Sequence, residues 1–264
     1  MKTVLFLFIS TLLFSQTYYS KIEPNEIRTI SSNVSGLVTY ANEFNLGEIL
    51  SKKPYIMIDK ELEEKELQTT KTKLKYLEET LKISQDVLVN LSKTLQRKEK
   101  NYNAIKSMSI KSQLEKDREF YNFITTKNQY LNTKKEIISL QTQQSDMLYK
   151  KSRLQKTIKE KSIINQNFIL YTLLVKPGQF VNFGTPLAQV ADISKAKLTI
   201  YLTKQDVINA KQKVIYINGQ KTSYKISRVV TIADSKNISK YLAQIIIEAP
   251  KVFSNLVKVE LKDD

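Results

Sequence analysis

A seven-residue repeat of large apolar residues dominates the middle of the chain. Its members are Leu67, Leu74, Leu81, Leu88, Leu95 and Tyr102. Three residues after each member comes a second set, half of it apolar: Thr70, Leu77, Ser84, Leu91, Lys98 and Ile105. Residues spaced alternately by three and four form one stripe along an α-helix and pair helices in coiled coils. The pattern predicts a long helix over residues 67–105 with one face against a partner helix.

A second repeat follows further along the chain. Its first part consists of Ile124, Leu131 and Ile138, and its second part, in a shifted register that predicts a stutter, consists of Leu140, Met147 and Leu154. Two such stretches in one chain can pair as an antiparallel hairpin, which we expect over residues 59–164. Its tip is expected at about residues 101–112, where apolar seam residues become rare. The alternative is a plain coiled coil between two chains.

Short strand-like runs flank the helical stretch on both sides. Neither glycine nor proline occurs between Tyr55 and Lys176, although both residues punctuate the segments outside it. β-Branched and aromatic residues gather in residues 30–38, 44–50, 55–59, 168–175, 176–181 and 183–190. The turns between these runs are expected at four glycines: Gly36, Gly47, Gly178 and Gly184. The pattern predicts one β domain that is split by a helical insertion.

The last part of the chain has strand-like alternation again. The runs cover residues 198–202, 214–217, 224–230 and 241–248. Asn218-Gly219 between two of them is a strong signal for a β-hairpin. We expect a small β domain over residues 194–250, followed by a C-terminal tail or a reduced further segment over residues 251–264.

The first residues have the composition of an export signal. Lys2 supplies a positive charge, and residues 4–14 are apolar apart from Ser10 and Thr11. An apolar core of this length fits a secretory signal peptide and is too short to span a bilayer. We expect residues 1–19 to be a signal peptide or an N-terminal anchor. The alternative is a buried strand or helix at the start of a cytosolic protein.

Composition excludes several kinds of chemistry. The 264 residues contain no histidine, cysteine or tryptophan, so that a Ser-His-Asp or Cys-His site and a cysteine-ligated zinc site are impossible. Paired carboxylates such as Glu63-Glu64 and Glu78-Glu79 are adjacent on the predicted helix and do not face one another. No phosphate-binding glycine motif occurs. We therefore expect no enzyme activity, no metal and no cofactor.

The β segments carry a resemblance to a known family. The segments SGLV (35–38), LGEIL (46–50), IMID (56–59) and PGQFVNFGTPLAQVAD (177–192) resemble, in this order around a helical hairpin, the periplasmic adaptor proteins of the HlyD family, also called membrane fusion proteins. The resemblance covers roughly residues 30–250. It implies an α+β fold in which a long antiparallel coiled-coil hairpin is inserted in a split lipoyl-like β-sandwich, followed by a small β-barrel. The expected halves of the sandwich are residues 20–58 and 165–193, and the barrel is residues 194–250.

The resemblance also implies a function without catalysis. Family members link an inner-membrane transporter, of RND or ABC type, to a TolC-like outer-membrane channel, and they associate as rings. The chain is accordingly expected in the periplasm, associated with the inner membrane, after export by its N-terminal signal. No covalent cofactor is implied, because the hairpin replaces the modified lysine of true lipoyl domains. The membrane-proximal domain of larger members is expected to be missing or reduced.

The predicted hairpin tip carries a partial match to the family's channel-docking motif. The family pattern Arg-x3-Leu-x6-Ser corresponds here to Lys98, Tyr102 and Ser109. Only the serine is retained, and lysine cannot form the bidentate contact that arginine forms with a carboxylate. The alternative interpretation makes Tyr102 the last seam residue and Lys98 a solvated one.

Charge adds a further reading of the tip. Lysine and arginine exceed aspartate and glutamate by 42 to 26 in the chain, and by eight to three within residues 93–118. A basic tip can dock an acidic channel rim through salt-sensitive contacts. Nucleic-acid binding is disfavoured because no motif accompanies the dispersed lysines. The alternative from another functional class is a basic coiled-coil scaffold, exported or cytosolic, without a role in transport.

Overall fold

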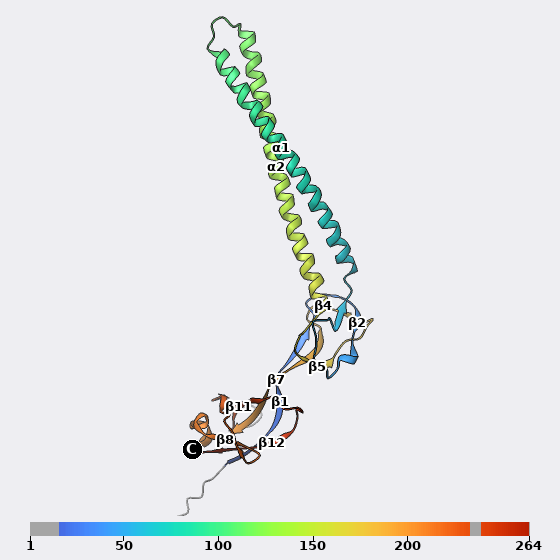
Figure 1. Cartoon of the computed structure of the whole chain (residues 1–264), viewed down its shortest axis with the longest axis vertical. Helices are drawn as coiled ribbons and strands as arrows, with labels where there is room; N and C mark the ends of the chain where they lie inside the picture. Colours follow the sequence, from blue (N-terminus) through green and yellow to red (C-terminus); the bar gives the residue numbers. More distant parts are fainter. Residues whose placement is uncertain (1–15, 233–238, 264) are drawn as a thin grey trace, which may run out of the picture. The chain divides into compact units, whose positions relative to one another are not determined.

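The computed structural model describes residues 16–232 and 239–263 and divides the chain into two compact units (Figure 1). A helical unit comprises Ile58–Ser162, and a β unit combines the described residues on either side of it. The chain therefore leaves a β structure, forms two long helices and returns to the same β structure. Residues 1–15 of the expected signal segment lie outside the described residues, whereas Gln16 already begins a strand.

The helical unit consists of α1 (Glu61–Lys106) and α2 (Gln113–Glu160), which run side by side and are joined at residues 107–112 (Figure 1). A capping box starts α2. The Ser112 hydroxyl accepts a hydrogen bond from the Glu115 N–H at 3.3 Å, and the Glu115 carboxylate accepts one from the Ser112 N–H at 3.0 Å. Helix α1 extends to Lys106, beyond the expected start of the tip, because residues 101–106 contain no helix breaker.

The stripe predicted on α1 is the face that packs on α2. All twelve residues of the two predicted sets are buried or half-buried, and Thr70, Leu74 and Ser84 are the most buried of them. The set includes hydroxyl residues, and the Ser84 hydroxyl lies 3.4 Å from a carboxylate oxygen of Glu136 on α2. Residues 84 and 136 are therefore at the same height along the hairpin.

The prediction for α2 was wrong in one respect. Leu131 and Ile138 are exposed by 48% and 56%, whereas Thr126, Ile137 and Leu154 are buried. The buried and half-buried positions run without a shift through Thr126, Thr133, Leu140, Met147 and Leu154, so that no stutter occurs. Apolar spacing alone selected the exposed leucine and isoleucine, although small threonines lie in the contact.

Within residues 16–232 and 239–263, the larger sheet of the β unit is antiparallel and has eight strands. Its order is β10-β11-β7-β1-β12-β8-β9, and β5 pairs with β7 in addition. The strands are β1 (Gln16–Ser31), β5 (Ile169–Leu173), β7 (Pro186–Leu202), β8 (Val214–Ile217), β9 (Gln220–Lys221), β10 (Ile226–Val229), β11 (Tyr241–Glu248) and β12 (Leu256–Lys262). The short helix α3 (Lys204–Ile208) and the turn η2 (Ala210–Gln212) follow β7.

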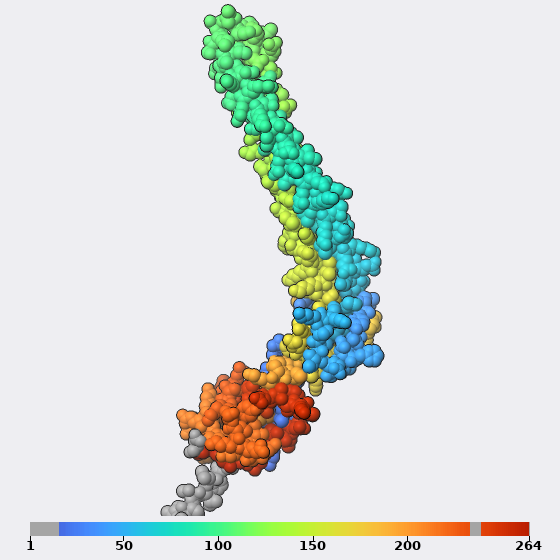
Figure 2. Space-filling view, viewed as in Figure 1, coloured from blue at the N-terminus to red at the C-terminus, as the bar shows by residue number. Residues whose placement is uncertain are grey.

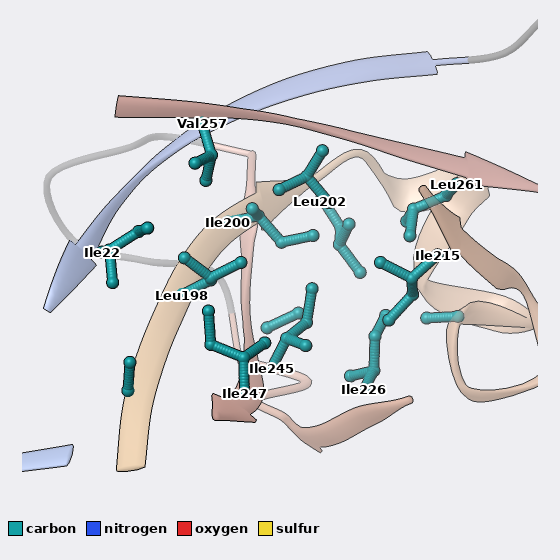
Figure 3. Packing of buried hydrophobic residues seen from close by; sticks show 14 residues of the cluster. Ile22, Leu198, Ile200, Leu202, Ile215, Ile226, Ile245, Ile247, Val257 and Leu261 are labelled. Carbon is teal, nitrogen blue, oxygen red and sulfur yellow. The ribbon is translucent and has the colours of Figure 1, made fainter. Parts of the chain in front are cut away.

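Residues 196–202 of strand β7 alternate between buried and partly exposed, and the buried side chains form the centre of the main core. Leu198, Ile200 and Leu202 are fully buried and face residues of β11 and β12 (Figure 3). The boundary expected between residues 193 and 194 lies inside β7, which therefore belongs to both of the expected β domains.

The end of the chain contributes to this core as well. Residues 251–264 were expected to be a tail or a reduced segment, but strand β12 pairs with both β1 and β8. Its alternate residues Val257, Val259 and Leu261 are buried in the cluster. Val257 and Leu261 are labelled in Figure 3. The partner of β12 is the first part of β1, residues 16–21, so that residues 16–19 form part of the sheet.

The second sheet has four strands in the order β4-β3-β2-β6. Its strands are β2 (Gly36–Ala41), β3 (Ile56–Ile58), β4 (Ser162–Ile163) and β6 (Phe180–Val181), with the turn η1 (Glu43–Asn45) after β2. Gly47, Gly178 and Gly184 have φ angles of +80°, +87° and +83°, a left-handed conformation that side chains disfavour. Gly36 is instead the first residue of β2 and pairs with Val181.

Candidate functional site

The described residues form no cluster suited to metal binding. Among them no group of three or more histidine, cysteine, aspartate or glutamate side chains is placed to hold a metal ion. None of the helices in the described part of the chain is long and apolar enough to cross a membrane. The candidate site is a region of the surface at the turn between α1 and α2.

An aromatic cluster fixes the helices directly below the turn. The Tyr102 ring of α1 stacks on Phe123 of α2 with centroids 5.9 Å apart and planes 3° apart, and it contacts Phe120 at 5.4 Å. Phe120 in turn packs edge-on against Tyr121 at 5.9 Å. These contacts hold the ends of the two helices together, since each aromatic pair adds about 0.5–1.5 kcal/mol beyond the burial of its area.

The turn itself exposes large apolar side chains. Ile110 is 90% exposed, Leu114 is 79% exposed and Met108 is 44% exposed. In the space-filling view the turn forms the free end of the helical unit (Figure 2). We call these three residues the apolar tip. Large apolar residues that are exposed close together in the sequence are typical of a protein contact surface.

The Glu115 carboxylate accepts several hydrogen bonds within the turn. Lys111 donates a hydrogen bond to its carboxylate at 3.0 Å, and the backbone and side chain of Ser112 donate two more. These hydrogen bonds lower the pKa of Glu115 to about 2, with that from Lys111 as the largest cause. These hydrogen bonds tie the Glu115 side chain to Lys111 and Ser112 at the start of α2.

The structure places the three residues chosen by motif spacing on two different elements. Ser109 is exposed in the turn, whereas Lys98 and Tyr102 are half-buried one helical turn apart on α1. The Tyr102 ring packs on α2. The apolar tip was missed in the sequence, although the segment from Ser112 to Glu115 has the S-x-x-E signature that starts a helix after a turn.

Comparison with known proteins gives a match in structure but not in sequence. No protein-family model matches the chain, and no curated protein is similar to it in sequence. The solved structure of MacA from Actinobacillus actinomycetemcomitans is 19% identical, with a TM-score of 0.70 over 95% of this chain and 79% of that one. The membrane fusion protein Spr0693 from Streptococcus pneumoniae R6 is 10% identical, with a TM-score of 0.54 over 95% of this chain and 100% of that one.

The chain has the fold of a membrane fusion protein. A third structure agrees with this conclusion: a MacA–MexA chimera that contains the Pseudomonas aeruginosa MexA α-hairpin domain is 17% identical, with a TM-score of 0.57 over 96% of this chain and 83% of that one. The membrane fusion protein fold therefore includes both units of this chain, the helical hairpin and the β unit that it interrupts. Sequence identities this low show only the fold and do not identify the partners of the chain.

Proposed function

We propose that this chain is a periplasmic adaptor that links an inner-membrane transporter to a TolC-like outer-membrane channel, and that it catalyses no reaction. The observation that carries the proposal is a rigid helical hairpin, inserted in a β unit with the membrane fusion protein fold, that ends in an exposed apolar and basic tip. Each arm is about 70 Å long at ~1.5 Å per residue. Such an arm gives reach rather than a globular core.

In this proposal the two helices of the hairpin pack on each other as a coiled coil. Support comes from the buried and half-buried positions of both helices, which follow one another at alternating intervals of three and four. The β unit supplies a lipoyl-like part, in which the two halves around the hairpin come together, and a barrel-like part closed by β1 and β12. These parts position the hairpin and contact the transporter.

The tip docks the channel. Ser109 and the apolar tip are accessible for this contact, and Lys98 adds positive charge further down α1. Tyr102 acts indirectly, because its ring packs on Phe120 and Phe123 and so keeps the two helix ends together. The excess of lysine and arginine in residues 93–118 favours an acidic rim on the channel.

Copies of the chain associate side by side as a ring. Exposed apolar residues occur on α1 at Tyr76, Ile83 and Val87, and on α2 at Leu131 and Ile138. The helical repeat of 100° per residue directs the α1 group and the α2 group to opposite flanks of the hairpin. The contact between Ser84 and Glu136 puts Ile83 and Ile138 at the same height. One flank of each copy can thus pack on the opposite flank of the next, an arrangement that closes into rings.

A single introduced thiol tests the docking, because the natural chain has no cysteine. The Ser109→Cys variant, treated with a thiol crosslinker in intact cells, is expected to form an adduct with an outer-membrane channel. A matched variant, Ser145→Cys, carries its thiol on an exposed part of α2 far from the tip and should give no channel adduct. A reagent that does not cross the inner membrane should label both variants if the hairpin lies in the periplasm. Exclusive self-crosslinking at residue 109 would contradict the proposal.

A further inference from the structure

The β unit has a cavity of about 440 Å³ on a side of the sheet that faces away from the core. Strands β1, β5 and β7 and the segment before β12 contribute its walls. The residues that matter for the argument are Ile27, Ala191, Ile169 and Tyr171 at one end, and Lys21 and Lys197 at the other. Ligand cavities in proteins commonly have about 300–1,000 Å³, so that this one is large enough for a small molecule.

The apolar end has a floor formed by three neighbouring strands. Ile27 on β1 pairs with Ala191 on β7, and Ala191 also pairs with Ile169 on β5. Because the middle residue has only a methyl group, a hollow is left between the two isoleucines. Tyr171 extends the same surface and is 59% exposed, while Ile27 is 48% exposed. Outward faces of antiparallel sheets are usually polar, so that this apolar hollow is unusual.

The other end of the cavity has more positive than negative charge. Glu23 on β1 lies opposite Lys197 on β7 in the strand register, and Lys21 lies two residues before Glu23. Within the described residues, no ion pair is formed by these three side chains. The ammonium group of Lys197 donates a long hydrogen bond of 3.4 Å to the Asn25 carbonyl, and its charge also acts on the Glu26 carboxylate, which pairs with Arg28. Among the residues that line the cavity, two lysines thus accompany one carboxylate.

We propose that this cavity binds a single anionic amphiphile, a molecule with an alkyl body and a carboxylate or similar head. The alkyl body covers the hollow over Ala191, where it removes apolar surface from water. The head lies between Lys21 and Lys197, because a charge-assisted contact is stronger than a neutral one. The site concerns the β unit alone and does not rest on the proposed docking of the hairpin.

Calorimetric titration of the purified full chain with ten-carbon ligands tests the charge of the head. Decanoate, decanol and decylammonium share one alkyl chain and differ in head charge. Decanoate is expected to bind most tightly and decylammonium most weakly. Equal affinities for the three compounds would overturn the proposal, since they would indicate non-specific apolar binding.

Variants locate the binding to this cavity. Lys197→Gln is expected to weaken decanoate binding by about tenfold and to leave decanol binding unchanged. The control Lys195→Gln changes an exposed lysine of the same strand outside the cavity and should have no effect. Ala191→Val fills the hollow, and Ile27→Asp puts a carboxylate beside it at an exposed position that folding tolerates; both should abolish binding of decanoate. Unchanged binding in these variants would overturn the assignment.

A second measurement separates a free amphiphile from a membrane surface. Sedimentation with phosphatidylglycerol vesicles is expected to recover little of the chain, because the cavity takes one molecule and not a bilayer. Vesicle binding without any binding of monomeric decanoate would overturn the proposal and would assign the two lysines to a membrane contact. Failure of decanoate to bind leaves the Ser109→Cys crosslink unaffected, so that the two proposals can fail separately.

Discussion

At the scale of single residues, one buried carboxylate joins the start of the sheet to the segment after β7. Asp206 of α3 is only 6% exposed and accepts hydrogen bonds from the Tyr18 hydroxyl, from the Thr203 hydroxyl at 2.8 Å and from the Lys213 ammonium at 3.2 Å. Burial alone would raise the pKa of Asp206, but these hydrogen bonds and the Lys213 charge outweigh burial and lower it.

The sign of this shift gives a pH dependence. A carboxyl whose folded pKa is lowered stabilises the fold above its unfolded pKa of about 3.9, and this contribution is lost as the pH falls through the folded pKa. Asp206→Asn is expected to lower the free energy of unfolding by about 2 kcal/mol at pH 7, since the buried network loses its negative charge and one of its two acceptor oxygens. Urea unfolding followed by tyrosine fluorescence measures the change.

The control variant changes a second carboxylate that pairs with Lys213. Asp263 also pairs with Lys213, at 3.9 Å, but its side chain is 76% exposed. Asp263→Asn should therefore change stability by less than about 0.5 kcal/mol. The difference between the natural chain and Asp206→Asn should shrink when unfolding is repeated near pH 3. A difference that is the same at both pH values would refute the assigned role of the charge.

At the scale of elements, the apolar residues of α2 belong to two different stripes, one buried against α1 and one exposed. Leu154 of α2 is 4% exposed in the contact with α1, whereas Leu131 of the same helix is 48% exposed. Leu154→Ala should destabilise the hairpin by about 2–4 kcal/mol through the lost burial and the cavity that is left. Leu131→Ala should change it by less than about 0.5 kcal/mol. Urea unfolding followed by far-ultraviolet circular dichroism, at a concentration where the chain is monomeric, compares the two variants. A larger effect of Leu131→Ala than of Leu154→Ala would instead support the predicted seam through Leu131 and Ile138.

The same elements show what the sequence could and could not predict. The stripe on α1 was predicted correctly because leucine occupies seven of its twelve buried or half-buried positions. On α2 the exposed Leu131 and Ile138 were more conspicuous than the buried Thr126. Which of two stripes is buried depends on the register against the other helix, and spacing within one helix does not contain that information.

The candidate site was predicted only in part, for a related reason. Motif spacing selected Tyr102, whose ring is occupied by Phe120 and Phe123 from the other helix, and it passed over Ile110 and Leu114. Contacts between the two helices determine which side chains near the tip are accessible to a partner. Strand β12 was expected as a tail although its residues alternate, because its partner β1 is more than two hundred residues away in the sequence.

At the scale of the whole molecule, the two apolar flanks of the hairpin make the proposed ring testable. Ile83 and Ile138 are exposed by 64% and 56% on opposite flanks. A contact between unlike flanks predicts that Ile83→Asp and Ile138→Asp each prevent the formation of large oligomers, because each change places a charge in an apolar contact. Sedimentation velocity of the purified variants measures the size. Tyr149→Asp, at a 73% exposed position that faces away from both flanks, should leave the oligomer intact.

Mixing the two single variants separates a ring from a two-fold dimer. Each variant retains one intact flank, and the two intact flanks are complementary, so that an equimolar mixture should form pairs and nothing larger. If like flanks met across a two-fold axis, the Ile138→Asp variant would still associate through the flank of Ile83. Association of that variant alone would therefore exclude the ring. Pairing that occurs only in the mixture would require the head-to-tail contact from which a closed ring around a transporter exit is built.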